Sequence, residues 1–351
     1  MKGIGFTVVS FLLFGVFSIT SCTKEVGPII SGGSGVYIAG YSSDPRTSFN
    51  VATCWKNNES IRLTNGSTNG RANSIFVAGP DVYIAGYDNN SAKLWKNGAP
   101  ILSTYGNLNA VFVSGTDVYA TGAIGNEVVY WKNGLTVSLS NGSKNEIPIS
   151  IFVSGSDVYV AGQENLSPDI LSKNNMGIPL AKYWRNSVSF YLTDGTRWSS
   201  TTSIIGSGSD IYIGGWELSE VITSDTIPPG VVRVAKYWKN GVPVSLSDGT
   251  ENAVINSVFI DGSDVYAAGY ENEYVDNLYY ISNAKYWKNG VSVTLTDGTY
   301  NATALSIAVS GTDVYVSGNG KNGAVYWKNG VEVALANGTG NASAFSIFVI
   351  P

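Results

Sequence analysis

The chain of 351 residues contains no histidine. Without an imidazole it has no Ser–His–Asp or Cys–His catalytic arrangement, and no zinc, haem or non-haem iron site with a histidine ligand. Glycine-rich phosphate-binding loops that end in a lysine are also missing, as are the Walker and Rossmann patterns. We therefore expect no cofactor and no bound metal, and carboxylate chemistry remains as the main catalytic option.

Cysteine and charge are scarce as well. Only Cys22 and Cys54 are present, and Cys54 occupies a position that holds tyrosine in related segments, so we expect a small buried apolar side chain there. Charged residues make up 13% of the chain, the formal net charge is −5, and no basic block occurs, so nucleic acid is not expected as a partner. The abundance of glycine, serine, asparagine and tyrosine is typical of a turn-rich all-β protein.

Long apolar runs are confined to the amino terminus. One stretch extends from Phe6 to Phe17 behind the basic Lys2, and small residues precede Cys22. This stretch is too short to span a membrane comfortably and is typical of the core of a signal peptide.

The ending Ile19-Thr20-Ser21-Cys22 resembles the lipobox of bacterial lipoproteins. In that family the cysteine receives a diacylglycerol and the preceding peptide is removed. The resemblance implies a lipoprotein signal peptide over residues 1–21, a lipidated tether over residues 22–30, and a membrane reached through acyl chains on Cys22. A threonine rather than an aspartate after this cysteine favours the outer membrane. A plain secretory signal is the alternative.

The main feature that is present is a motif repeated seven times, approximately SIFVSGSDVYVAGY followed by AKYWKNG, VSVTL and TDGT. It contains four short runs rich in β-branched and aromatic residues, separated by turn residues, and its Asn-Gly pair favours a tight type I′ hairpin. Such a repeat indicates a blade of a β-propeller or another β-array. One tryptophan per repeat is expected to fill the space between blades: Trp55, Trp95, Trp131, Trp184, Trp238, Trp287 and Trp327.

The order of the runs at the two ends indicates a closed ring. The first repeat begins at its second run, from Gly35 to Ile38, and the chain ends with an extra first run, from Ser346 to Val349. Pairing these segments leaves no open edge between the first and last blades. The sequence therefore predicts an all-β domain over residues 31–351, a seven-bladed β-propeller of four-stranded antiparallel blades closed by the C-terminal strand. Its repeats resemble those of bacterial lipoproteins with seven-bladed propeller bodies, a largely uncharacterised family.

The connections differ between the two faces of the predicted propeller. Those after the first and third strands are short and uniform, whereas those after the second strand vary. The repeat tyrosine and tryptophan are 12 residues apart in repeats two, three and seven, but 18, 25, 26 and 21 apart in repeats one, four, five and six. Function tends to reside in loops on a rigid scaffold, so the long loops of blades four to six are expected to surround a binding site.

Two tryptophans fall outside the repeat position, and both map to the variable face of blade five. Aromatic rings beside acids, amides and an arginine suit the stacking and hydrogen bonding of sugars. The predicted ligand-binding residues are Trp198, Trp216, Arg197, Glu217, Tyr270, Glu271 and Tyr274. Consensus packing of the Gly-Tyr or Gly-Trp corner is the alternative for the aromatic members of this set.

Three functions are open at this point. The first, which we favour, is a non-catalytic, lipid-anchored cell-envelope protein that binds a glycan or protein ligand, with no catalytic residue. The second is a structural or assembly subunit of an envelope complex. The third is a polysaccharide-active enzyme that uses carboxylates such as Glu146, Glu217, Glu251 and Glu271. The aspartate repeated in GSDVY suggests calcium ligation, but capping of its own tight turn is the expected role.

Overall fold

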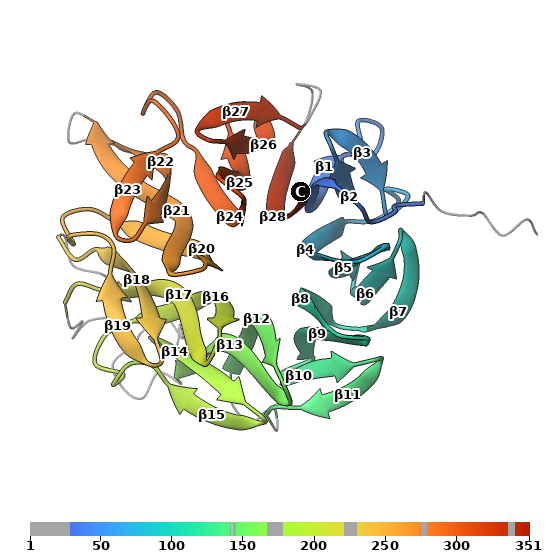
Figure 1. The fold of residues 1–351 in the computed structure, drawn as a ribbon, viewed down its shortest axis with the longest axis horizontal. Coiled ribbons are helices and arrows are strands. Elements are labelled where there is room, and N and C mark those ends of the chain that lie inside the picture. Colours follow the sequence, from blue (N-terminus) through green and yellow to red (C-terminus); the bar gives the residue numbers. More distant parts are fainter. Residues whose placement is uncertain are drawn as a thin grey trace, which may run out of the picture.

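The computed structural model describes residues 29–140, 142, 145–166, 178–220, 230–275, 279–335 and 341–351. Within this part of the chain there are 28 strands and no helix, and the strands form seven four-stranded antiparallel sheets around a central axis (Figure 1). This confirms the predicted seven-bladed β-propeller. The predicted signal peptide and Cys22 lie outside the described residues. Among the described residues, no helix is long and apolar enough to cross a membrane.

The blades are numbered here in chain order, and in each the strand nearest the axis is given first. The strands are, in blade 1, β28 (Ala342–Ile350), β1 (Gly35–Ser43), β2 (Asn50–Lys56) and β3 (Glu59–Arg62); in blade 2, β4 (Gly70–Ala78), β5 (Asp81–Asp88), β6 (Ser91–Lys96) and β7 (Ala99–Tyr105); in blade 3, β8 (Asn107–Ser114), β9 (Asp117–Ile124), β10 (Glu127–Lys132) and β11 (Leu135–Ser138); and in blade 4, β12 (Asn145–Ser154), β13 (Asp157–Leu166), β14 (Ile178–Arg185) and β15 (Val188–Tyr191). They continue, in blade 5, with β16 (Ser199–Ser207), β17 (Asp210–Leu218), β18 (Arg233–Lys239) and β19 (Val242–Ser245); in blade 6, with β20 (Ala253–Asp261), β21 (Asp264–Val275), β22 (Tyr279–Lys288) and β23 (Val291–Thr294); and in blade 7, with β24 (Thr303–Ser310), β25 (Asp313–Gly320), β26 (Gly323–Lys328) and β27 (Val331–Ala334).

The ring closes through blade 1 as the sequence predicts. The C-terminal β28 pairs antiparallel with β1, from Gly35 opposite Ile350 to Ser42 opposite Ala342. The two ends of the chain therefore contribute to one sheet, and the first and last blades share no open strand edge.

Packing between blades is built on the repeat tryptophans, each only 0–2% exposed. Trp55 of blade 1 lies in one apolar cluster with Tyr315 and Ala324 of blade 7, and Trp327 of blade 7 lies in one with Tyr266 of blade 6. This confirms their role as inter-blade filler. Cys54 is also fully buried, as expected, and its burial raises the pKa of the thiol to about 12.

The repeated aspartate joins neighbouring strands rather than capping its own turn, so the expected role was wrong in detail. In blade 2, Asp81 accepts hydrogen bonds from Asn97 at 2.9 Å and from the Lys96 ammonium at 2.8 Å. Asn97 in turn accepts from the backbone N–H of Val82 at 2.8 Å. Blades 3 to 7 repeat this contact, with Arg185 in place of lysine in blade 4. The bonded carboxyls have lowered pKa values because lysine or arginine and asparagine donate to them.

Every innermost strand contains a β-bulge near its start, where one residue is skipped in the pairing with the second strand. The glycine at the end of the VAG segment of the repeat, which reads ATG in blade 3, faces this bulge. A Cβ on Gly122, for example, would lie 1.9 Å from the carbonyl oxygen of Asn107, so only glycine fits. The seven bulge residues are Asn73, Asn109, Ile149, Thr202, Asn256, Leu305 and Phe345.

Two sets of hydrogen bonds join the innermost strands around the axis. Polar bulge residues donate to a carbonyl of the next blade, as Asn73 does to Leu108 at 2.7 Å. The serine after the bulge accepts from a backbone N–H of the next blade, as Ser74 does from Val111 at 3.2 Å. Six of the seven blades make the serine bond, and in blade 3 alanine occupies the position.

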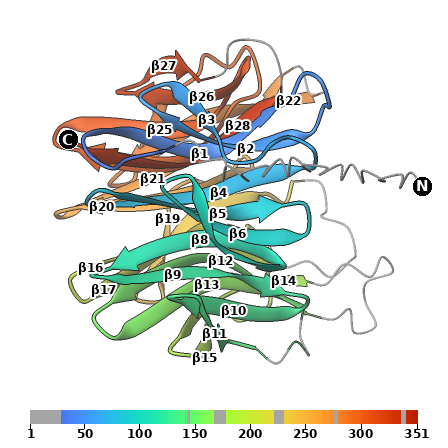
Figure 2. The same cartoon turned by 90° about the vertical axis from the view of Figure 1, so that its right-hand side faces the viewer.

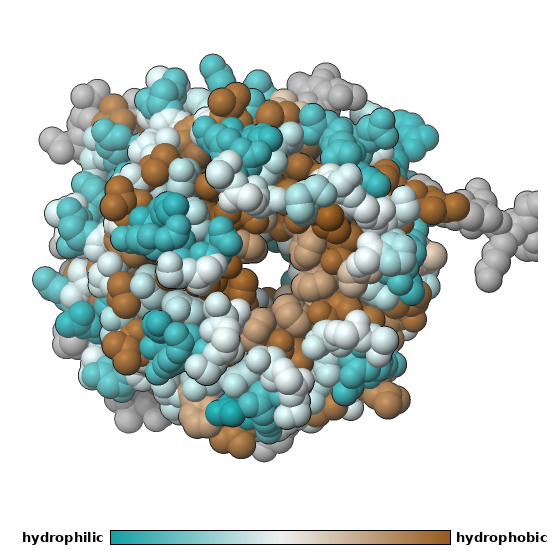
Figure 3. Space-filling view, in the orientation of Figure 1, coloured by the Kyte–Doolittle hydropathy of each residue, from teal (hydrophilic) through white to brown (hydrophobic). Residues whose placement is uncertain are grey.

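The two faces of the ring differ. One carries the turns after the first and third strands of each blade, and the C-terminus ends there (Figure 2). Viewed on this face, hydrophilic patches recur blade by blade around an opening at the axis that is bordered by apolar surface (Figure 3). The first described residues bind the same face, because Ile30 donates to Asn97 and Gly32 donates to Pro80. The opposite face carries the bulges and the connections that vary in length.

Candidate functional site

A cavity lies between blades 5 and 6 on the variable face, with a volume of about 420 Å³. We call it the blade 5–6 cavity. Its lining combines two tyrosines, one arginine, amides and hydroxyls: Val231, Arg233, Asn252, Tyr270, Asn272, Tyr280, Ser282 and Thr303. Of the predicted binding residues, Tyr270 therefore lines this cavity directly.

Arg233 connects the cavity to a predicted tryptophan. Its guanidinium lies over the Trp216 ring, 4.6 Å from the ring centre, in cation–π contact. Its backbone N–H donates to Asn252 at 2.9 Å, which fixes the start of β18. Among the described residues no carboxylate lies within 4.0 Å of this guanidinium, so its donors are free of a salt bridge in this part of the chain. Trp216 thus supports an arginine that faces the cavity.

The long hairpin of blade 6 provides an aromatic pair at the edge of the same cavity. Tyr274 on β21 and Tyr280 on β22 meet edge to face with ring centres 6.3 Å apart. Both rings are about half exposed, at 54% and 53%. Between them and the body of the blade, Ser282 donates to Asn272 at 2.9 Å, which orients the amide. Tyr274 therefore does not line the cavity itself but contacts Tyr280, which does.

The remaining predicted residues lie elsewhere on blades 5 and 6. Arg197 and Glu217 line a second cavity of about 290 Å³. The backbone carbonyl of Trp198 accepts from Leu218 at 2.9 Å, and its ring is half-buried. Glu271 contacts the Lys285 ammonium. The structure therefore does not bring the seven predicted residues together in one site: three line two separate cavities, and the other four do not line either one.

Lysine–glutamate pairs occur in the three blades with the longest loops, and the sequence reading missed them. Glu217 contacts Lys236, as Glu271 contacts Lys285. In blade 4 the pair is buried: Lys182, with a side chain 1% exposed, contacts Glu146 and lies 3.0 Å from Glu164. The sequence does contain a signal for these pairs: where the lysine is replaced by valine, in blades 3 and 7, the neighbouring second strand has no glutamate.

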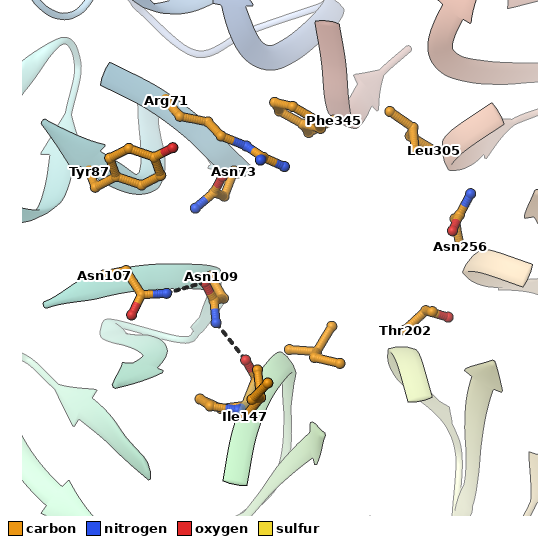
Figure 4. A pocket seen from close by; sticks show the side chains of 12 residues that line it. Arg71, Asn73, Tyr87, Asn107, Asn109, Ile147, Thr202, Asn256, Leu305 and Phe345 are labelled. Carbon is orange, nitrogen blue, oxygen red and sulfur yellow. Dashed lines mark hydrogen bonds between the residues drawn. The ribbon is translucent and has the colours of Figure 1, made fainter. Parts of the chain in front are cut away.

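A third cavity lies at the axis, on the variable face, and has a volume of about 490 Å³. We call it the channel mouth. All seven bulge residues line it, together with Arg71, Tyr87, Asn107, Ile147 and Pro148 (Figure 4). No carboxylate is among these lining residues, and Arg71 carries the one formal charge among them. The repeat pattern does not single out this arginine, because no other blade has an arginine at the corresponding position.

The described part of the chain contains no cluster of side chains suited to a metal ion. Among the described residues, no group of three aspartate, glutamate or cysteine side chains is arranged to hold an ion. The repeated aspartates are each committed to a lysine or arginine and to an asparagine.

Comparison with known proteins adds little beyond the fold. No protein-family model matches the chain, and no curated protein sequence matches it. Among solved structures it is similar to TolB from Acinetobacter baumannii, with 13% identity, a TM-score of 0.45, and coverage of 76% of this chain and 66% of that chain. It is also similar to the polysaccharide lyase Uly1, with 11% identity, a TM-score of 0.43, and coverage of 92% and 90%. A chain of a nidogen/laminin complex has 8% identity, a TM-score of 0.41, and coverage of 89% and 97%.

Proposed function

We propose that this chain is a non-catalytic, lipid-anchored binding protein of the bacterial cell envelope that holds a glycan in the blade 5–6 cavity. The observation that carries the proposal is the convergence of Tyr270, Tyr280 and the Arg233–Trp216 stack on one cavity edged by amides and hydroxyls. Aromatic faces pack against the C–H surface of a sugar ring, while amides and arginine bind its hydroxyls. A cavity of about 420 Å³ suits a short segment of a longer chain.

The position of the amino-terminal segment supports an anchored arrangement. Ile30 and Gly32 are hydrogen-bonded to the short-turn face, opposite the cavities. Residues 23–28 separate that segment from Cys22, and six residues span at most about 20 Å. Acyl chains on Cys22 would therefore hold the short-turn face near the membrane and leave the variable face accessible to a glycan. Outer-membrane location is part of this proposal.

The test is binding of the full chain, in mild detergent, to a panel of neutral and acidic oligosaccharides, followed by tryptophan fluorescence and calorimetry. We expect Tyr270→Ala and Tyr280→Ala to weaken binding of the retained oligosaccharide about fivefold each, because one aromatic contact contributes about 1 kcal/mol. Tyr105→Ala is the matched control, since Tyr105 is an exposed tyrosine on the outermost strand of blade 2. Retention of no oligosaccharide, or equal losses in all three variants, would contradict the proposal.

Glycan cleavage by carboxylates is the second candidate, and one observation favours it. Burial, followed by the charge of Glu271, raises the pKa of Glu251, and one of its carboxyl oxygens is buried without a hydrogen-bond partner. A carboxyl with a raised pKa beside a second carboxyl is the arrangement expected of a general acid and its partner. Release of reducing ends by the wild type and its loss in Glu251→Gln would favour this function over simple binding.

A further inference from the structure

Arg71 at the channel mouth is a cation without an anionic partner. It lies on β4 opposite Tyr87, and its guanidinium carbon is 3.5 Å from the centre of the Phe345 ring. Figure 4 shows the guanidinium beside this ring at the edge of the cavity. The Nε–H is buried and has no hydrogen-bond partner, and among the described residues no carboxylate lies within 4.0 Å. The lysines and the arginine of the short-turn face differ from Arg71, because each of them is paired with an aspartate.

This arrangement is unfavourable for the empty protein. A buried donor without a partner destabilises the protein, and more so when the group is charged. The cation–π contact with Phe345 offsets part of this loss. Burial also lowers the pKa of Arg71. An unsatisfied group of this kind in a cavity is expected where a ligand supplies the missing partner.

The rest of the lining limits what that ligand is. Asn73, Asn109 and Asn256 use their N–H donors to bind carbonyls of the next blade, so their amides are fixed. The amide oxygens of Asn73 and Asn256 remain as acceptors for ligand hydroxyls. Phe345 and Leu305 provide an apolar wall on one side. A fitting ligand therefore has one carboxylate, several hydroxyls and a C–H face.

We propose that the channel mouth binds a hydroxylated carboxylate of the uronic acid class, with the carboxylate accepting hydrogen bonds from the Arg71 guanidinium. An arginine fork matches the two oxygens of a carboxylate. The amide oxygens of the bulge residues accept from the sugar hydroxyls. This site is separate from the blade 5–6 cavity and does not depend on it, so it is tested by its own arginine.

The experiment is calorimetric titration of the full chain in mild detergent with sodium D-glucuronate, D-glucose and sodium chloride. We expect D-glucuronate to bind at least tenfold more tightly than D-glucose, and chloride to give no heat of binding. Arg71→Gln should weaken D-glucuronate binding at least tenfold. Arg71→Lys keeps the charge without the fork and should fall between them. Arg185→Gln, on the short-turn face and outside both cavities, should leave this binding unchanged.

Melting temperatures provide a second measurement. Because Arg71 has an unsatisfied donor, Arg71→Gln is expected to melt at the same temperature as the wild type or higher, which a structural arginine would not do. Failure of D-glucuronate to bind, equal binding of D-glucose, or unchanged binding in Arg71→Gln would overturn the proposal. If Arg71→Gln does not fold, Arg71→Lys decides the question: weaker D-glucuronate binding than in the wild type supports the proposal, and unchanged binding overturns it.

Discussion

Single side chains determine how neighbouring blades are joined at the axis. The serine bond from one innermost strand to the next is made by every blade that has the serine, and blade 3 has Ala110 there. A serine at this position would accept a hydrogen bond from the backbone N–H of Ile151. At the same interface Asn109 donates to Pro148, so this interface keeps the bond from the bulge residue and lacks the serine bond.

Ala110→Ser is therefore expected to stabilise the protein, by about 0.5–1.5 kcal/mol, because it adds the seventh serine bond. Ser74→Ala removes one such bond and should destabilise the protein by a similar amount. Urea unfolding followed by circular dichroism measures both. A loss of stability in Ala110→Ser would mean that blade 3 lacks the geometry for the bond.

Glu251 makes stability depend on pH. Its folded-state pKa is raised above the ordinary value by burial, and then by Glu271, Asp248 and Glu273. The folded protein therefore binds this proton more tightly than the unfolded chain, and stability falls as the pH rises from about 4.5 through the raised pKa.

Glu251→Gln should consequently melt higher than the wild type at pH 7, because a neutral amide avoids the buried charge. Below pH 4 the carboxyl is protonated in both states, and the difference between the two proteins should disappear. Thermal melts across this pH range provide the measurement. A variant that is less stable at pH 7 would show that the carboxylate is held by a favourable contact.

The hairpin between the third and fourth strands is the most regular element of the blade. In blade 3, Asn133 has a φ of 51° and Gly134 a φ of 83°, as a type I′ turn requires. The Asn133 side chain also accepts from Val118 and donates to Asp117. The residue thus combines a backbone role with a link to the second strand.

Asn133→Ala is expected to destabilise the protein by about 1–2 kcal/mol, because it loses both bonds and because alanine tolerates the left-handed region less well than asparagine. Asn133→Gly loses the same bonds but accepts the backbone angle, so it should recover about 1 kcal/mol. Chemical denaturation of the two variants separates the contributions. Equal stabilities would show that the turn relaxes and that only the side-chain bonds matter.

The elements with a strong local sequence pattern were predictable from the sequence. Those that depend on contact with the backbone of a neighbouring strand were not. Asn-Gly turns, the four apolar runs and the buried tryptophans follow from propensity and periodicity. The bulges do not, since they depend on the carbonyl that meets each VAG glycine, such as Gly122. The channel mouth was missed for the same reason. Arg71 meets Phe345, near the other end of the chain, only after the ring has closed.

At the scale of the whole molecule, β28 determines whether the ring is closed. It supplies the innermost strand of blade 1, and its Ile347 and Ser346 bond to blades 7 and 2. A chain that ends at residue 341 should lose cooperative unfolding and elute as aggregates, because blade 1 then exposes an unpaired edge. Size-exclusion chromatography and thermal melts are the measurements. A monomer with the wild-type melting temperature would show that the ring does not need this strand.

The attachment of Ile30 and Gly32 to the short-turn face also limits how the molecule can be oriented. If Cys22 carries lipid, the short-turn face stays toward the membrane, because the segment between Cys22 and Ile30 is too short for the propeller to invert. Both cavities would then open away from the bilayer, toward the medium or the periplasmic wall. Long polymers would be captured from solution, and lipid headgroups of the same membrane would stay out of reach.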